Sequence, residues 1–246
     1  MRAYIPVQLM QYVLEKKISK VFRSFVFLKY HSGNGIIKID KSSCIELAQL
    51  LDINVRTFKR HLQALNDIGW IGFDDHERAF VRGWYQISLK IGRAFTSKVE
   101  FHSNYLVQTN WQGYIMGSII GRFVLVKQFV QKREGQKNGC SLQAREQYFP
   151  FSCRLGSEII NISRSRINDL IIIAVGLKYI ALKPGKLEAT SADPKMINHL
   201  EKQWQSGEPF PVTIGGKVYL KYPNKYYPLL HYKKAKYQSG QKSDNN

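Results

Sequence analysis

The chain has 246 residues, and its 37 Lys and Arg against 18 Asp and Glu give a formal net charge of +19. This length fits one large domain or two small ones, and 44% apolar residues with 13% aromatics can fill hydrophobic cores, which excludes disorder for most of the chain. Only 22% of the residues are charged, which is an ordinary fraction. The positive charge therefore comes from a shortage of Asp and Glu and not from an excess of Lys and Arg. The balance favours a polyanionic partner, with nucleic acid ahead of an anionic membrane.

The cysteines and the apolar runs indicate the cellular compartment. The three cysteines lie far apart and fit neither a disulfide framework nor a Cys-built zinc site. The most apolar runs, residues 114–130 and 170–177, are respectively interrupted by two bases and too short to cross about 30 Å of hydrocarbon. The N-terminal stretch lacks the pattern of a signal peptide. We therefore expect a soluble, cytoplasmic protein with no membrane partner.

The first part of the chain alternates helical and strand patterns. Apolar spacing over residues 7–30 predicts one long amphipathic helix with a basic face. A Gly-rich cluster ends it, and residues 36–39 are predicted to form a short strand. Ser43 and Glu46 have the spacing of a capping box, so a second helix is expected to begin at Ser43.

A third helix is predicted after a tight turn at residues 52–54. Its apolar residues share one face, and Gly69 ends it. Residues 70–73 and 79–84 are then expected to form two strands around a charged tip, residues 74–78.

This order of elements resembles the winged helix-turn-helix family of DNA-binding domains. The resemblance is carried by residues 44–73, CIELAQLLDINVRTFKRHLQALNDIGWIGF. Ala48 stands where the two helices touch, Ile53 lies beneath the turn, and Phe58 is on the buried side of the third helix. The resemblance implies that the third helix enters the major groove of DNA.

A second copy of the pattern is predicted over residues 152–182, after a helix expected over residues 111–132. It follows the first copy at one constant offset, and the matched pairs are Ala48 with Ser157, Ile53 with Ile162, Phe58 with Ile167 and Cys44 with Cys153. The stretch from Gly176 to the next strand is expected to be two residues longer than after Gly69. The alternative interpretation is a buried helical segment that merely begins with Ser.

The remaining segments are less regular. Residues 85–91 are predicted to be a strand, residues 92–110 a connection, and residues 194–204 a short helix. Residues 211–220 have a hairpin pattern around two glycines, and the last ten residues are expected to be disordered.

The predicted architecture is therefore α+β, with two tandem winged helix-turn-helix domains and a basic C-terminal extension. The first domain is expected over residues 1–95, the second over 96–190, and the extension over 191–246, where Lys and Tyr are frequent.

Contacts to DNA are predicted on the early, exposed side of the third helix: Asn54, Arg56, Thr57, Lys59, Arg60 and His61. Arg56 and Lys59 suit the acceptors of guanine best. Asn54 could instead cap the helix, and Lys59 with Arg60 could simply form a solvated face.

The second copy offers a similar set: Ser163, Arg164, Ser165, Arg166 and Asn168. Ser163 is better suited to capping the helix than to contacting nucleobases. Asp169 occupies the position that matches Arg60 in the first copy. This copy is therefore expected to depend on phosphate contacts and DNA shape.

Two further basic groups are predicted to contact phosphates. The acidic tip of the first hairpin argues against its insertion into DNA and leaves Arg78 and Arg82 as contacts. In the tail, phosphate contact is expected from Lys233, Lys234 and Lys236, while Tyr219 and Tyr222 are expected to pack.

The sequence gives little support for an enzyme. No two histidines have the spacing of a two-His metal face on a helix, residues 33–35 lack the rest of a nucleotide-binding pattern, and the acids at the hairpin tip fit a solvated turn. We therefore expect no catalysis, no metal and no cofactor.

The leading hypothesis is a double-stranded DNA-binding protein that acts as a transcriptional regulator, with a homodimer as an open possibility. Tandem winged helices are similar in architecture to plasmid replication initiators, so an initiator that binds repeated origin sites is the alternative. A module for protein or RNA interaction is the third hypothesis.

Overall fold

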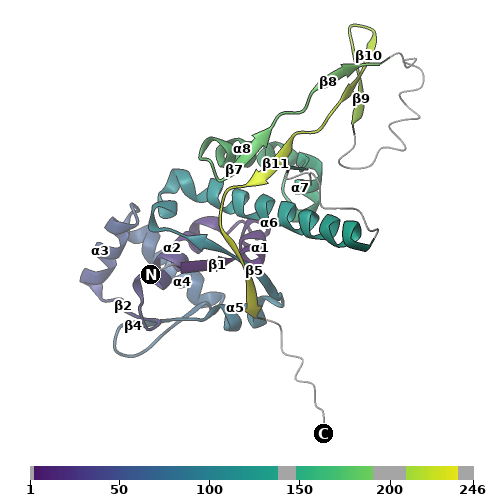
Figure 1. Cartoon of the computed structure of the whole chain (residues 1–246). Helices are drawn as coiled ribbons and strands as arrows, with labels where there is room; N and C mark the ends of the chain where they lie inside the picture. Colours follow the sequence, from purple (N-terminus) through teal and green to yellow (C-terminus); the bar gives the residue numbers. More distant parts are fainter. Residues whose placement is uncertain (1–2, 138–147, 191–208, 238–246) are drawn as a thin grey trace. The chain divides into compact units, whose positions relative to one another are not determined.

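The computed structural model describes residues 3–137, 148–190 and 209–237 (Figure 1). It is a mixed α+β structure of helices and small three-stranded sheets, which confirms the α+β part of the predicted architecture. The chain divides into two units: unit 1 comprises residues 1–119 and 231–246, and unit 2 comprises residues 120–230. Unit 1 is therefore assembled from both ends of the chain.

The N-terminal region holds two helices, so the prediction of one long helix is wrong. Helix α1 (Val7–Glu15) and helix α2 (Ser19–His31) are separated by a sharp break. Lys17 is left-handed there (φ 58°), and the amide of Ile18 donates to the carbonyl of Val13 (3.0 Å), which closes α1. The break lets the apolar sides of both helices be buried, which one straight helix would not allow.

The next elements follow the predicted order. They form two helices joined by a tight turn and bordered by the antiparallel sheet β2-β4-β3. Their bounds are β2 (Ile36–Lys38), α3 (Lys41–Leu50), α4 (Val55–Asp67), β3 (Ile71–Phe73) and β4 (Arg78–Val81).

Helix α3 begins two residues before the predicted start, because its N-cap is Asp40 rather than Ser43. The Asp40 carboxylate accepts a hydrogen bond from the amide of Ser43 (2.7 Å). Asp is as good an N-cap as Ser, and it precedes Ser43 in the chain, so the capping-box prediction is wrong in detail.

Residues 84–101 differ from prediction. The expected strand at 85–91 is helix α5 (Trp84–Ile91), which begins after Gly83 and ends at left-handed Gly92 (φ 66°). The expected connection contains strand β5 (Phe95–Phe101), which is the middle strand of the sheet β1-β5-β12.

The outer strands of this sheet come from the two ends of the chain. They are β1 (Ala3–Pro6) and β12 (Tyr232–Tyr237). The Tyr232 hydroxyl donates to the carbonyls of Gly117 and Ser118 (3.0 and 3.1 Å), which holds β12 in unit 1. Strand β12, which lies in the region predicted as the basic C-terminal extension, is thus ordered through residue 237, and the predicted disorder beyond it lies outside the described residues.

The core of unit 1 is rich in aromatic residues. Trp70 is 1% exposed, and its ring lies 5.3 Å from Phe25, 6.0 Å from Phe22 and 6.4 Å from Tyr12. Helix α2 therefore packs against Trp70 and helix α4.

A short 3-10 helix, η1 (Ser103–Leu106), precedes α6 (Gln108–Lys137), which begins in unit 1 and continues in unit 2. This confirms the helix predicted over residues 111–132. In the part of the chain that the structure describes, Asn110–Arg133 is the one helical stretch long and apolar enough to span a membrane by length and composition. The structure buries 56% of its most apolar window, and a buried core helix passes the same test.

Unit 2 contains a second pair of short helices, α7 (Cys153–Ile160) and α8 (Arg164–Gly176). They border the sheet β6-β11-β7. Its strands are β6 (Phe149–Pro150), β7 (Ile180–Lys183) and β11 (Lys225–Pro228).

The other sheet of unit 2 has the order β8-β10-β9. The hairpin predicted around Gly215 and Gly216 is confirmed, since both glycines have positive φ (56° and 75°). The helix predicted over residues 194–204 lies outside the described residues. The strands are β8 (Leu187–Ala189), β9 (Phe210–Ile214) and β10 (Lys217–Lys221).

The two helix pairs repeat each other's backbone at the constant offset that the sequence predicted. Asp52 and Asn161 are both left-handed (φ 51° and 56°), and so are Gly69 and Lys178 (φ 67° and 57°). The left-handed residue that corresponds to Gly69 is Lys178 rather than Gly176, so strand β7 begins two residues after it, as β3 does after Gly69. Counted from Gly176, the stretch to the strand is two residues longer, as predicted.

Strand β11 occupies in unit 2 the place that β4 occupies in unit 1. Each is the central strand of its sheet, and Ile71 pairs with Val81 as Ile180 pairs with Pro228. The first pair closes a short hairpin, whereas the second pair encloses the whole sheet β8-β10-β9. The units therefore do not coincide with the boundaries expected after residues 95 and 190.

Gly156 allows α7 and α8 to approach closely. A Cβ at this position would lie 2.9 Å from Ile167 and 3.0 Å from Phe151. We expect Gly156→Ala to destabilise the protein by about 1–3 kcal/mol in urea unfolding, because the added methyl overpacks the interface.

The matched control is Gly176→Ala at the end of α8, where nothing lies within 4 Å of the added atom. It is expected to be neutral or to stabilise by up to about 1 kcal/mol. Equal effects at the two glycines would contradict this account of the close approach.

Candidate nucleic-acid interface

One face of α4 is basic and solvent-exposed. Phe58, Leu62 and Leu65 bury the opposite face, which directs the polar side chains outward. A shallow depression follows this outer face, lined by Val55, Arg56, Lys59, Arg60 and Gln63.

The three bases on this face are not neutralised. Within the described residues, the side chains of Arg56, Lys59 and Arg60 make no ion pair or hydrogen bond. Some basic side chains elsewhere are paired, as Arg93 is with Glu15 (2.6 Å) and Arg154 with Glu158 (3.0 Å). This face of α4 is therefore free to attract an external polyanion.

Asn54 serves as the N-cap of α4, as the capping alternative predicted. Its side-chain oxygen accepts from the amide of Arg56 (2.8 Å). The bond fixes the first turn of α4, so Asn54 positions the basic residues.

Two predicted contacts lie on the side of α4 that faces α2. His61 Nδ1 is 2.7 Å from the hydroxyl of Ser24, and Thr57 is half-buried nearby. Burial lowers the pKa of His61, and the charges of Arg23 and Lys20 lower it further. The structure separates His61 and Thr57 from the exposed bases.

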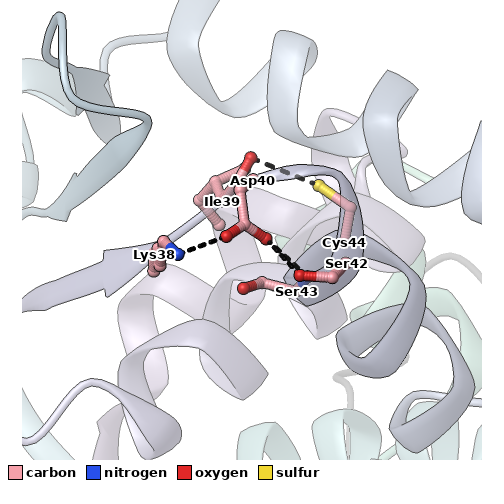
Figure 2. Close-up of polar contacts among 6 residues, drawn as sticks. All are labelled: Lys38, Ile39, Asp40, Ser42, Ser43 and Cys44. Carbon is pink, nitrogen blue, oxygen red and sulfur yellow. Dashed lines mark hydrogen bonds and ion pairs between the residues drawn. The ribbon is translucent and has the colours of Figure 1, made fainter.

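The start of α3 is held by a polar network (Figure 2). The Asp40 carboxylate accepts from the hydroxyl of Ser42 (2.8 Å) and pairs with the ammonium of Lys38 (2.5 Å). The thiol of Cys44 donates to the carbonyl of Ile39 (3.6 Å). These contacts join β2 to α3. The bonds that Asp40 accepts keep the pKa of its carboxyl well below its usual range, the bond from Lys38 being the largest cause.

This network predicts a pH-dependent effect at Asp40. Because the pKa is lower in the folded state, the carboxylate stabilises the fold above the unfolded value of about 4, and this contribution is lost as the pH falls through the folded-state pKa. Asp40→Asn retains a capping oxygen and removes the charge. We expect it to lower the melting temperature at pH 7 and to match the wild type increasingly as the pH falls below about 4.

Asp75→Asn, at the exposed hairpin tip, is the control and should leave the melting temperature unchanged. A difference between wild type and Asp40→Asn that is independent of pH would refute the electrostatic explanation.

The first hairpin does not present the arginines as expected. Arg78 forms a bond from Nε to the Asp74 carboxylate (2.7 Å) and an ion pair through Nη2 (2.7 Å), so its charge is compensated. Arg82 is half-buried, and its carbonyl accepts from the ammonium of Lys29 (2.8 Å). Neither arginine is placed like the bases of α4.

In unit 2, the predicted residues lie at the exposed start of α8. Ser163 caps the helix by accepting from the amide of Arg166 (3.3 Å), as predicted. Arg164, Ser165 and Arg166 are exposed, and Asn168 lies 3.9 Å from the thiol of Cys153. Further along this helix, Ile172 is 62% exposed, which makes its outer face less polar than that of α4.

The tail lysines lie on the sheet of unit 1. Lys233 is directly opposite Lys98, and the ammoniums of both lie over the ring of Tyr4, at 4.8 and 5.3 Å. Lys234 is exposed opposite Ser97. Lys236 belongs to β12, but its side chain lies outside the described residues.

Sequence reasoning missed Lys98 and Tyr4 as members of this basic group. Tyr4 and Lys98 are far apart in the chain, and Lys233 is farther still from Tyr4. The pairing of the three strands β1, β5 and β12 brings them together, and no local pattern could reveal that.

No family model, curated protein or solved structure matches the chain. Among the residues that the structure describes, no group of three or more His, Cys, Asp or Glu side chains is placed to hold a metal ion.

Proposed function

We propose that the chain binds double-stranded DNA through a winged helix-turn-helix in unit 1, with α4 in the major groove, and that it acts as a transcriptional regulator. The observation that carries the proposal is the exposed face of α4, where Arg56, Lys59 and Arg60 have no protein partner among the described residues. Arginine and lysine donors suit the acceptors of guanine and the phosphate oxygens beside them.

The order of elements supports this assignment. A helix, a short strand, two helices joined by a tight turn and a β-hairpin follow one another in unit 1, and the sheet order β2-β4-β3 brings the hairpin beside the helix pair. In this arrangement the second helix of the pair is the one exposed for groove binding.

Unit 2 is proposed as a second winged helix-turn-helix. The repeated left-handed turns, the capped start of α8 and the equivalent place of β11 all support it. With Asp169 and Ile172 on its outer part, α8 is assigned phosphate contacts through Arg164 and Arg166.

The hairpins are assigned different roles. The first has an acidic tip whose one ion pair among the described residues is internal. The second hairpin, formed by β9 and β10 of unit 2, has longer strands and carries exposed Lys217 and Lys221, and Lys183 is exposed at the end of β7. The second hairpin is therefore the better candidate for a contact with the DNA backbone.

The test is selection of bound duplexes from a random pool, followed by footprinting of the selected site. Two modules predict a bipartite site with a fixed spacing. Enrichment of several tandem repeats would favour a replication initiator over a regulator, and failure to enrich any duplex would refute the proposal.

A further inference from the structure

A cavity of about 280 Å³ lies in unit 1, on the side of α4 away from the basic face. Helix α2 contributes Ser19, Lys20 and Arg23, and α4 with its N-cap contributes Asn54, Thr57 and His61. The volume is at the small end for ligand sites and suits one small polar group.

The cavity carries positive charge. Arg23 is 6% exposed, and its Nε and Nη2 donate to the carbonyls of Leu106 and Leu51. Neither bond uses Nη1, and Lys20 adds a second cation. Asp52 also lines the cavity and offsets one charge, so the lining retains a net charge of about +1 with His61 neutral.

A hydroxyl in the lining is unsatisfied. Ser19 Oγ is buried and has no hydrogen-bond partner among the described residues. The Trp111 indole donates to the carbonyl of the same residue (2.9 Å), which fixes the Ser19 backbone. A buried hydroxyl without a partner is unfavourable, and an oxyanion in the cavity would accept its hydrogen.

We infer that this cavity binds a phosphate oxyanion, with Ser19, Lys20 and Arg23 as donors. The oxyanion belongs either to a free phosphate ester or to the backbone of duplex DNA. Asn54 and Thr57 lie at the start of α4, so an oxyanion in the cavity would stabilise the start of this helix. That this stabilisation promotes DNA binding rests on the proposed function, whereas the anion site itself does not.

The test follows the His61 imidazole by NMR in the full chain. An anion beside an imidazole favours its protonated form, so occupancy should raise the pKa of His61. The pKa is measured in chloride, in inorganic phosphate at the same ionic strength, and with duplex DNA in place of phosphate. His76 at the exposed hairpin tip is the internal control and should not respond.

Two variants test the donors. Lys20→Gln and Ser19→Ala are each expected to weaken the response, by about tenfold in apparent affinity for Lys20→Gln because a charged hydrogen bond is removed. Lys41→Gln is the matched control, since Lys41 is also an exposed lysine in the first turn of a helix and does not line the cavity.

The outcomes separate the two sources. A response to inorganic phosphate supports a site for a free phosphate ester, and a response to DNA alone supports a backbone phosphate. No response to either overturns the inference, as does an equal response in Lys20→Gln and wild type.

DNA binding is measured separately, by the fluorescence anisotropy of a labelled duplex in the same samples. DNA binding with no change at His61 in either phosphate or DNA would refute the cavity site alone. A change with phosphate but no DNA binding would refute the DNA proposal alone.

Discussion

Replacing Arg56, Lys59 and Arg60 together with alanine is expected to weaken duplex-DNA binding by at least about a hundredfold. Each direct base contact is worth about 1–3 kcal/mol, and each neutralised phosphate adds to the affinity at moderate salt. These side chains point away from the core and have no partner among the described residues, so their removal should leave the fold intact. Equilibrium titration of a labelled duplex with wild type and variant measures the effect.

The control is Lys90→Ala, which removes one exposed charge from helix α5 of the same unit. It is expected to change the affinity only slightly. The triple variant should also show a shallower dependence of binding on salt, by about 0.9 for each phosphate that is no longer neutralised. If it bound like Lys90→Ala, α4 would not be at the DNA.

Replacing Trp70 with alanine is expected to cost about 3–5 kcal/mol of unfolding free energy. The indole is 1% exposed and lies against the rings of Phe22, Phe25 and Tyr12. Its removal leaves a cavity beside α1 and α2, which the surrounding helices can fill only in part. Urea unfolding followed by far-UV circular dichroism measures the destabilisation.

Tyr85→Ala is the matched control, because Tyr85 is an aromatic residue of the same unit that is 44% exposed. Its effect should remain within about 0.5 kcal/mol. A cost for Trp70→Ala near that of Tyr85→Ala would contradict the assignment of Trp70 to the centre of the core.

The parts of the fold that local patterns determine could be predicted from the sequence. The turn at residues 52–54, helix α4 and the hairpin after Gly69 were predicted close to their observed bounds, and the second helix pair lies within the predicted span 152–182. Each has a cap or a left-handed residue beside an apolar periodicity, and both signals are local.

Segments that depend on distant pairing or an unusual backbone could not be predicted. Lys17 is left-handed without the glycine that usually marks such a break, so α1 and α2 looked continuous. Strand β11 pairs with β7 although the sheet β8-β10-β9 lies between them in the chain, which hid the end of unit 2. The error at α5 had a different cause, because Trp84, Ile87 and Ile91 have helical spacing in a segment too short to exclude a strand.

The candidate site was predicted in part. The exposed bases of α4 follow from helical periodicity, and Asn54 and Ser163 follow from their capping positions. The inward placement of His61 and the pairing of Arg78 with Asp74 depend on contacts made after folding, one of them with α2. The charges counted along the sequence do not show which basic side chains form ion pairs in the folded protein.

The salt dependence of binding tests most directly whether the +19 chain binds duplex DNA through the basic side chains of α4. The full chain is titrated with a labelled duplex at a series of salt concentrations. We predict that the logarithm of the binding constant falls steeply and linearly with the logarithm of salt, with a slope of about −0.9 for each neutralised phosphate. Affinity that is absent, or unchanged by salt, would contradict the account.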